Sequence, residues 1–303
     1  MEQTKVGIIG TNWGRVHIGA FKNAKCTIDA LIGKDLEKTQ FVAFQESVPV
    51  AATELETLNA LDVSVIATPI ETHQSLLPRV STPAIYCEKP LGISKDFYSD
   101  FSTEQLIGVN YAFGYLKTAQ CAKAAIESLS LGQVNEISIE QSAHSDKDIS
   151  IQQLFKEVCV HPLSWIFQVF GPINYLSHAL NDNTMSVDLA LADSDLKVHF
   201  KRQKKAGIKL SVKIKGDKNT MVFKGGYSPA KQWFFDPILI GRDPINKGEY
   251  SRENDIWYQA NCIAVKTFVD LYNDRIDLET AKSLGYFSLD DAFKFEKFIN
   301  HLS

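Results

Sequence analysis

The first twenty residues constrain the fold of this chain more than any other stretch, because an apolar run leads directly into a glycine turn. Residues 6–9 (Val-Gly-Ile-Ile) predict a short buried strand. A helix with Val16, Ile18 and Phe21 among its apolar positions is expected to begin near Gly14. A strand, a glycine turn and a helix in this order indicate the first unit of a dinucleotide-binding fold, in which the turn amides and the helix N-terminus bind a pyrophosphate.

The glycine turn departs from the usual G-x-G-x-x-G spacing. Gly10 fits the first position, Asn12 stands where the second glycine belongs, and Gly14 arrives one residue early. This shorter turn predicts a pyrophosphate held in a modified geometry, and a glycine turn in an α/β protein with no nucleotide is the alternative. The predicted cofactor contacts of this stretch are Gly10, Thr11, Asn12, Trp13, Gly14 and Arg15.

The end of the second predicted strand, residues 27–32, bears on the choice between NAD and NADP. An NAD site has an acidic residue here that binds the ribose 2′-hydroxyl, whereas this chain has Gly33 followed by Lys34. Because no carboxylate repels a 2′-phosphate and Lys34 can pair with it, we expect NADP(H) as the preferred cofactor. The alternative is that Lys34 is a solvated residue at a helix start and Asp35 binds the ribose, which would favour NAD(H).

Short apolar runs alternate with helical segments through the first third of the chain. This alternation predicts βαβ units and a parallel sheet, and ligands of such sheets bind at the carboxyl ends of the strands. We therefore assign residues 1–116 to an NAD(P)-binding Rossmann domain. Its strands are expected at residues 6–9, 27–32, 48–51, 62–67, 83–87 and 105–110, and the strand ends bring Gly10, Lys34, Thr68, Lys89 and Asn110 to one edge.

The pattern changes after Tyr115 to long helices and strands of period two. It predicts an α+β domain over residues 117–303, built on a large mixed or antiparallel sheet. Its closing helix, residues 288–302, packs there or back toward the first domain. Residues 233–240 are expected in an oligomer interface, a substrate lid or the core. The other predicted helices are residues 117–128, 152–170 and 254–272, and the strands are residues 132–142, 186–191, 196–201, 209–215 and 220–223.

Composition argues against two classes of partner. The chain has 303 residues, a net charge of −4 and no long basic run, which argues against nucleic acid. No apolar run approaches the ~18 residues that cross a membrane.

Five scattered cysteines without C-x-x-C spacing, in a chain that begins directly in a strand, predict a cytoplasmic protein with reduced thiols. We predict no metal site.

Four features together resemble the glucose–fructose oxidoreductase, inositol dehydrogenase and rhizopine-catabolism family (Gfo/Idh/MocA), and their order and spacing cover nearly the whole chain. They are the glycine turn with Arg15-Val-His17, Ile66-Ala-Thr-Pro69 with His73, Cys87-Glu-Lys-Pro90, and the helix that contains His161. The resemblance implies an enzyme that transfers a hydride between a nicotinamide cofactor and a small sugar, polyol-like or cyclic carbonyl substrate. It adds Thr68, Pro69, His73, Glu88 and Lys89 to the cofactor-binding residues.

The resemblance also implies catalytic residues. Lys89 matches the family lysine beside the nicotinamide, His161 matches the histidine of a D-x-x-x-H segment, and Glu157 takes the place of its aspartate. A lysine or histidine with a pKa near neutrality can transfer the proton that accompanies a hydride, and Glu157 and His161, four residues apart, can form a relay on one helix face. The plainer interpretations are a Lys89–Glu88 ion pair, a packed His161 and a surface Glu157. Pro162 argues against one unbroken helix, and a helix that begins at Val160 would place it in the first turn.

Departures from the family pattern leave other functions open. Ser164 stands where the family has an aspartate, and Ala112 where relatives often have arginine, which puts a typical sugar substrate in doubt. The turn Gly10-Thr-Asn-Trp-Gly14 is similar to that of thiazolinyl imine reductases, so an NADPH-dependent imine reductase of a siderophore-type pathway is one alternative. A nucleotide-sensing regulator without catalysis is another. The resemblance further implies a homodimer or homotetramer formed through the open, apolar face of the C-terminal sheet.

Overall fold

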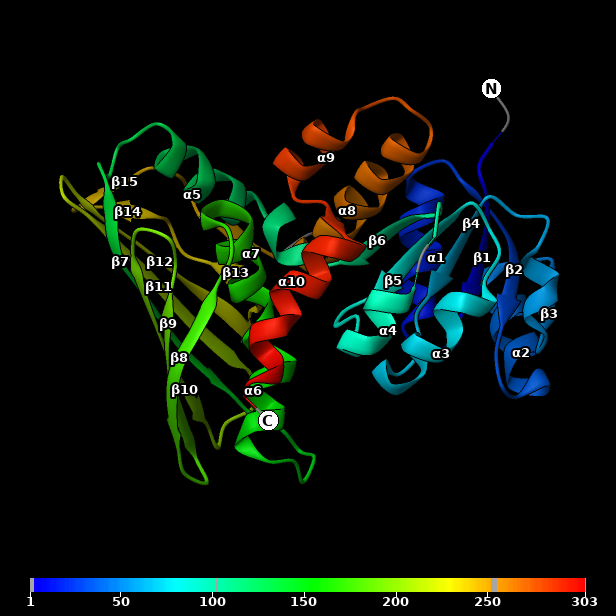
Figure 1. The fold of residues 1–303 in the computed structure, drawn as a ribbon, viewed down its shortest axis with the longest axis horizontal. Helices are drawn as coiled ribbons and strands as arrows, with labels where there is room; N and C mark the ends of the chain where they lie inside the picture. Colours follow the sequence, from blue (N-terminus) through cyan, green and yellow to red (C-terminus); the bar gives the residue numbers. More distant parts are fainter. Residues whose placement is uncertain (1–2, 102, 252–254, 303) are drawn as a thin grey trace. The chain divides into compact units, whose positions relative to one another are not determined.

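The computed structural model describes residues 3–101, 103–251 and 255–302. The chain forms two compact units, each of which has its own sheet (Figure 1). The N-terminal unit holds residues 1–112 and 260–296, and the C-terminal unit holds residues 113–259 and 297–303. The predicted boundary at residue 116 lies close to the first division. Residues 260–287 were predicted to lie in the second domain, but their apolar side chains, among them Val265, Phe268 and Tyr286, belong to the core of the N-terminal unit. For the closing helix the prediction allowed either domain, and its residues up to 296 belong to the N-terminal unit.

The sheet of the N-terminal unit has seven strands in the order β17-β6-β5-β4-β1-β2-β3. Six are parallel, as the alternation in the sequence predicts, and β17 pairs antiparallel with β6. The central strands are buried along their whole length, which explains their continuous apolar runs. The strands are β1 (Lys5–Ile9), β2 (Thr27–Ile32), β3 (Val50–Ala52), β4 (Val63–Ile66), β5 (Ala84–Glu88), β6 (Leu106–Asn110) and β17 (Phe287–Ser288).

Helices cover this sheet and supply its core. Phe21 of α1 and Phe268 of α8 pack in one cluster with Ile8 and Val65 of the central strands. The predicted helix 254–272 begins outside the described residues and corresponds to α8. The helices are α1 (Gly14–Asn23), α2 (Leu36–Glu46), α3 (His73–Leu76), α4 (Lys95–Asp100), α8 (Ile256–Tyr272), α9 (Leu278–Leu284) and α10 (Leu289–Asn300), with short 3₁₀ turns η1 (Leu55–Leu58), η2 (Ile70–Thr72) and η3 (Leu77–Arg79). Both α8 and α10 continue into the C-terminal unit.

The C-terminal unit is built on a mixed sheet of ten strands, which confirms the predicted α+β class. The order β15-β14-β12-β11-β7-β10-β9-β8 is antiparallel except for the pair β7 and β10, and β13 and β16 attach beside β12. The strands are β7 (Val134–Ala143), β8 (Asn174–Leu180), β9 (Thr184–Ala190), β10 (Asp195–Arg202), β11 (Ile208–Gly216), β12 (Thr220–Ser228), β13 (Gln232–Phe235), β14 (Leu239–Ile240), β15 (Asp243–Pro244) and β16 (Glu249–Tyr250).

Burial alternates along these strands, so the sheet has a core side and an open side. On the core side, Ile139, Phe200 and Val212 are buried, and Phe155 packs edge-on against Phe200. The helices of this unit are η4 (Ala112–Tyr115), α5 (Lys117–Glu127), α6 (Ile151–Val158) and α7 (Val160–Phe170). The expectation of an apolar open face is wrong, because the residues between the buried ones include Glu140, Ser142, His199, Lys201, Lys209 and Ser211.

The predicted helix 152–170 is two helices. It divides at Cys159, and α7 begins at Val160 with Pro162 in its first turn, as the proline predicted. Within the described ranges, no helix is both long and apolar enough to cross a membrane.

Candidate cofactor site and active site

The glycine turn lies against the ends of three strands of the N-terminal sheet. Gly10 has a φ of +119°, and a Cβ atom there would lie 2.3 Å from the carbonyl oxygen of Ala67. Its amide donates to the carbonyl of Ile32 at 2.8 Å. Glycine is therefore required here both by conformation and by space, and the turn is held at the carboxyl edge of β1, β2 and β4.

The start of α1 suits an anion. Its first turn, Gly14 to His17, brings no carboxylate, and among the described side chains none caps the helix. Trp13 is 60% exposed beside it. Arg15 is directed elsewhere than predicted: its Nε lies 2.7 Å from the Glu46 carboxylate at the end of α2, so this ion pair competes with a cofactor contact.

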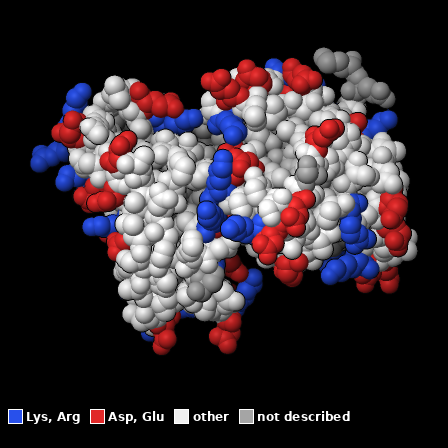
Figure 2. Space-filling view, in the orientation of Figure 1, with Lys and Arg blue, Asp and Glu red and all other residues white. Residues whose placement is uncertain are grey.

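Two lysines follow β2 along the chain, and one of them, Lys38 of α2, contacts the glycine turn. Lys34 is exposed, and Lys38 Nζ donates to the side-chain oxygen of Asn12 at 3.3 Å. Asp35 caps α2, because its carboxylate accepts the Lys38 amide at 2.9 Å. On the face drawn in Figure 2, Lys and Arg side chains gather beside α2. Sequence reasoning missed Lys38, although its place in the first turn of the helix after β2 was a usable signal.

The carboxylate of Glu88, at the end of β5, is the centre of a largely buried polar network. Its Oε1 lies 2.7 Å from His17 Nε2 and accepts the Asn110 amide at 2.8 Å, and its Oε2 accepts the backbone N–H of Lys89 at 3.1 Å. Asn110 also donates to Asn261 of α8 at 2.8 Å and accepts the Tyr86 hydroxyl at 2.9 Å. Glu88 thus acts within the protein, as the link between β5 and α1.

Burial alone would raise the pKa of Glu88. The hydrogen bond and charge of His17, the Asn110 amide and the charge of Lys89 outweigh that effect, and they hold the pKa below its ordinary value of 4.5. The carboxylate therefore stays ionised at neutral pH. The contacts of His17 were not foreseen from the sequence, where His17 served only as part of a motif.

The end of β4 places Thr68 and Pro69 on the same edge of the sheet. Thr68 is half-buried and Pro69 exposed, and the Thr68 hydroxyl pairs with that of Thr72 at 2.6 Å. His73 is almost wholly buried, and its two ring nitrogens lie 2.9 Å from the Thr68 carbonyl and 3.1 Å from the Pro90 carbonyl. His73 was predicted to bind the cofactor, but these contacts occupy its ring, so it supports the loops after β4 and β5.

Lys89 follows β5 directly, as predicted. It is half-buried, and its peptide bond to Pro90 is cis. The Glu88 carboxylate accepts from His17, Asn110 and the Lys89 backbone, and the charge of Lys89 also acts on it. The N-terminal unit therefore brings together the glycine turn, the lysines after β2, Thr68 and Lys89 at one edge of its sheet.

In the C-terminal unit, His161 lies in the first turn of α7 among aromatic side chains. Its ring is half-buried and stands edge-on to Trp257 with ring centroids 4.9 Å apart, and Trp257 stacks on Trp233 at 4.6 Å. These rings, together with Phe113 and Phe235, line a cavity of about 20 Å³. Ser164, the residue in place of the family aspartate, donates to the His161 carbonyl at 2.8 Å.

Glu157 does not share a helix with His161. It lies on α6, before the break at Cys159, its side chain is 51% exposed, and its carboxylate pairs with Lys147 at 3.9 Å. The helix break thus removes the basis of the predicted relay. An exposed carboxylate held by a surface lysine is the plainer of the two interpretations that the sequence allowed.

Comparison with solved structures finds likeness over the whole chain at low sequence identity. An oxidoreductase from Agrobacterium radiobacter, in complex with NAD+, L-tartaric acid and magnesium, is 15% identical with a TM-score of 0.72, covering 99% of this chain and 95% of that one. An oxidoreductase from Thermotoga maritima is 14% identical with a TM-score of 0.76, covering 99% and 96%. A super-repressor mutant of Gal80p from Saccharomyces cerevisiae is 14% identical with a TM-score of 0.79, covering 99% and 95%.

No family model matches the sequence, and neither does any curated protein. The likeness to solved structures nevertheless extends over 99% of the chain and includes several oxidoreductases. The resemblance seen in the sequence is therefore confirmed at the level of the fold: this chain has the fold of oxidoreductases of the Gfo/Idh/MocA type.

Proposed function

We propose that the protein is an NAD(P)-dependent oxidoreductase that transfers a hydride between the nicotinamide and a small sugar, polyol-like or cyclic carbonyl substrate. One observation supports this most. Gly10, a position that only glycine can occupy, lies at the same carboxyl edge of the parallel sheet as Lys89. Dinucleotides bind at this edge in such folds. A structure of the same fold in complex with NAD+ supports the same interpretation.

The residues at this edge fit a dinucleotide. The start of α1 has no side-chain cap and no acidic residue in its first turn, which suits it to bind a pyrophosphate. A bound nicotinamide supplies the hydride acceptor or donor. Lys89 then moves the proton: it takes the hydroxyl proton as the alcohol carbon loses its hydride, and it gives a proton to the oxygen in the reverse direction. A charged Lys89 also polarises a carbonyl oxygen, and His161 is a second candidate for proton transfer.

We further propose a preference for NADPH over NADH. Two lysines support it: Lys34, two residues after the end of β2, and Lys38 on the first turn of α2, where Lys38 reaches Asn12 of the glycine turn. Asp35 uses its carboxylate to cap α2, which makes it a poor ligand for a ribose hydroxyl. Two cations without a competing acid favour a 2′-phosphate.

Replacing Lys38 with alanine is expected to weaken NADPH binding about tenfold, the effect of losing one charge-assisted hydrogen bond. The affinity for NADH should stay the same, because NADH has no 2′-phosphate. Fluorescence titration with both nucleotides measures this. Lys5→Ala, at the amino end of β1 on the opposite edge of the sheet, is the control, and an equal loss for both nucleotides would contradict the assignment of Lys38.

Turnover on a panel of sugars, polyols, cyclic carbonyls and imines, followed through the absorbance of the reduced nicotinamide, tests the proposed function. Oxidation of a polyol or reduction of a carbonyl is the expected result. Turnover of imines alone would favour the imine reductase. Tight nucleotide binding with no turnover on any substrate would favour the regulator and contradict the enzyme.

We also propose a homodimer or homotetramer formed through the open side of the C-terminal sheet. That side is polar, with a cavity of about 480 Å³ lined by Glu140, His199, Lys201, Lys209 and Lys224 among others. In register, Glu140 lies between His199 and Ser211, and Ser142 lies between Lys201 and Lys209. A second copy related by a two-fold axis can pair each Glu140 with a lysine of the partner, so the mixed charge is self-complementary.

Light scattering at micromolar concentration should give the mass of two or four chains for the unaltered protein. Lys209→Glu places a carboxylate beside Ser142, on the proposed interface. It is expected to shift the protein toward the monomer, because this carboxylate and a Glu140 carboxylate would repel each other across the interface. Lys25→Glu, on the N-terminal unit, is the control. A Lys209→Glu protein that keeps the full mass would contradict this interface.

The five cysteines, all among the described residues, form no disulfide. Burial raises the pKa of Cys26 to about 11 and that of Cys159 well above its ordinary value, so these thiols are protonated and unreactive. Buried thiols without disulfides are typical of proteins from reducing compartments, and they support a cytoplasmic location as part of the proposal.

A further inference from the structure

The loop after β5, residues 89–92, is held on one side by a carboxylate from the far end of the chain. Glu296 of α10 accepts the Leu91 amide at 2.5 Å and the Gly92 amide at 2.8 Å, and it also accepts the Tyr111 hydroxyl at 2.6 Å. Its side chain is only 7% exposed. Leu91 and Gly92 are two and three residues from Lys89, so Glu296 fixes the backbone that carries the lysine.

The same loop is held from two other directions. The Glu88 carboxylate accepts the Lys89 amide at 3.1 Å, and the His73 ring lies 3.1 Å from the Pro90 carbonyl. Each residue from Lys89 to Gly92 therefore has one backbone group bound to a buried or half-buried ionisable side chain. Ordinary loops are not fixed at every residue in this way, whereas sites that must hold a reacting group in place are.

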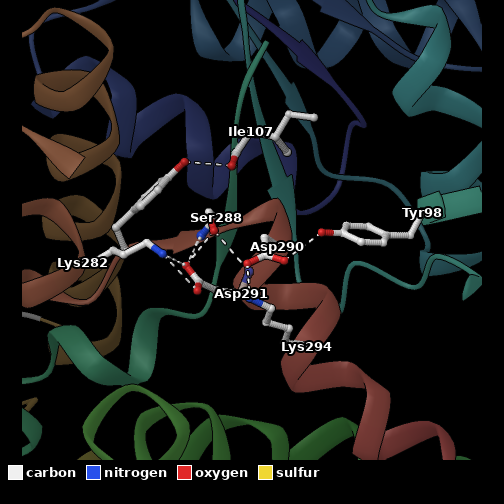
Figure 3. A network of polar contacts seen from close by, with 8 residues as sticks. Tyr98, Ile107, Lys282, Ser288, Asp290, Asp291 and Lys294 are labelled. Atoms are coloured by element: carbon white, nitrogen blue, oxygen red, sulfur yellow. Dashed lines mark hydrogen bonds and ion pairs between the residues drawn. The ribbon is translucent and has the colours of Figure 1, made fainter. Parts of the chain in front are cut away.

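The helix that carries Glu296 is anchored independently of the loop. Figure 3 shows how the start of α10 is tied down: Asp290 accepts the Tyr98 hydroxyl at 2.8 Å and pairs with Lys294 at 2.6 Å, and Asp291 accepts the Ser288 hydroxyl at 2.6 Å. The Tyr98 ring also stacks on Phe293 with centroids 3.8 Å apart. Glu296 consequently extends from a fixed support.

A carboxylate is a costly choice at this position if packing were its only role. Burial raises the pKa of Glu296, and its hydrogen bonds to Tyr111, Gly92 and Leu91 only partly reverse the shift. Burial and the nearby Glu296 also raise the pKa of Tyr111, so its hydroxyl stays a donor. An apolar side chain would avoid this desolvation, but it would leave the Leu91 and Gly92 amides without an acceptor.

We propose that Glu296 is a positioning residue of the reaction, which holds the Lys89 loop so that the lysine amine stays at the reacting oxygen. The proposal rests on the role given to Lys89 above. It makes the C-terminal helix α10 part of the catalytic apparatus. Glu296 acts through the backbone of Leu91 and Gly92 and does not touch substrate or cofactor.

Glu296→Gln is the direct test, because glutamine keeps the shape but offers only one oxygen, which leaves one loop amide facing an NH₂ group. Turnover is expected to fall about a hundredfold, the scale of effect of a misplaced catalytic group. The Kd for NADPH, which does not depend on the lysine amine, should stay within twofold. Glu296→Ala should lose more turnover than Glu296→Gln, since it has no acceptor at all.

Asp270→Asn is the matched control, since Asp270 is a carboxylate on another helix of the same unit, α8, and it pairs with Lys266 and Arg275 but binds no group of the loop. It should lower the midpoint of thermal unfolding by a similar amount and keep turnover within threefold of the unaltered protein. If Glu296→Gln also kept turnover within threefold, or if both variants lost turnover in proportion to stability, the positioning role would be overturned.

Hydrogen exchange of the unaltered protein gives a test that does not depend on a variant that folds. The Leu91 and Gly92 amides should be protected although they lie in a loop, and exchange of both at the rate of an open chain would overturn the clamp. Lys89→Ala separates the two proposals. An inactive Lys89→Ala with a fully active Glu296→Gln would overturn the clamp alone, whereas a fully active Lys89→Ala would overturn the role of Lys89 and the clamp with it.

Discussion

Lys89→Ala is expected to lower turnover about a thousandfold, which is the contribution of a well-placed general acid or base. The lysine follows β5 at the edge of the sheet where the glycine turn lies, and its loop is fixed at each of four residues. This fixed backbone supports the proposed role of its amine in proton transfer. Because the proposed contacts to the pyrophosphate and ribose are made by other residues, the Kd for NADPH should change less than threefold. Steady-state kinetics and fluorescence titration on the same protein preparation measure both quantities.

Two further variants sharpen the Lys89 result. Lys89→Arg keeps the positive charge, but a guanidinium does not release its proton near neutral pH. Turnover close to that of Lys89→Ala would therefore assign proton transfer to the lysine, and recovery to near the original level would assign charge alone. Lys95→Ala, on the exposed start of α4, is the control for a lost lysine. Normal turnover by Lys89→Ala would contradict the catalytic assignment.

His17→Ala is expected to lower the free energy of unfolding by about 3 kcal/mol, the scale of breaking a buried pair from one side. The His17 side chain is fully buried, and the Glu88 carboxylate that it contacts at 2.7 Å stays in place. The variant leaves a cavity and takes one partner from a buried charge. Urea denaturation at neutral pH measures the change.

The effect of His17→Ala should depend on pH in one direction. The folded-state pKa of Glu88 lies below its ordinary value of 4.5, so its ionisation contributes stability above that pH, and this stability is lost as the pH falls through the folded-state pKa. The difference between His17→Ala and the unaltered protein should therefore shrink on acidification below pH 4.5. His17→Gln, which keeps a donor near the Nε2 position, should cost about 1 kcal/mol. His301→Ala, at an exposed position, should cost less than about 0.5 kcal/mol. A loss equal to that of His17→Ala would contradict the importance given to the His17–Glu88 pair.

The strands of the parallel sheet were predictable because strands that are buried on both faces have continuous apolar sequences. Residues 27–32 coincide with β2, and the other five parallel strands lie within two residues of the predicted bounds. Period two in residues 132–142 and 209–215 likewise identified β7 and β11. Local periodicity carries this information, so no tertiary context was needed.

Other parts of the fold depend on contacts between distant residues. Strand β8 is an edge strand, largely exposed on both faces, so its sequence Asn-Tyr-Leu-Ser-His-Ala-Leu shows no clear alternation. Residues 260–296 return to the first sheet, which no local pattern indicates. Arg15 and Glu157 were assigned to the site from their place in a motif, but Glu46 and Lys147 compete for their charges.

The sequence held one usable signal for Glu296, namely a charged residue on the apolar face of a predicted helix. It lies on the buried stripe of α10 with Ala292, Phe295 and Ile299, where a charged residue needs a partner. The pattern could reveal that a buried carboxylate was present, but its partners, the Leu91 and Gly92 amides, lie more than 200 residues away along the chain. Only the fold brings them together.

Calorimetric titration of the unaltered protein with NADPH and with NADH tests the central claim most directly, since the fold, the glycine turn and the lysines after β2 all lead to a nicotinamide dinucleotide. We expect saturable binding of one dinucleotide per chain, about tenfold tighter for NADPH. Binding of neither dinucleotide would contradict the claim that the protein binds a nicotinamide cofactor. Tighter binding of NADH would contradict the roles of Lys34 and Lys38.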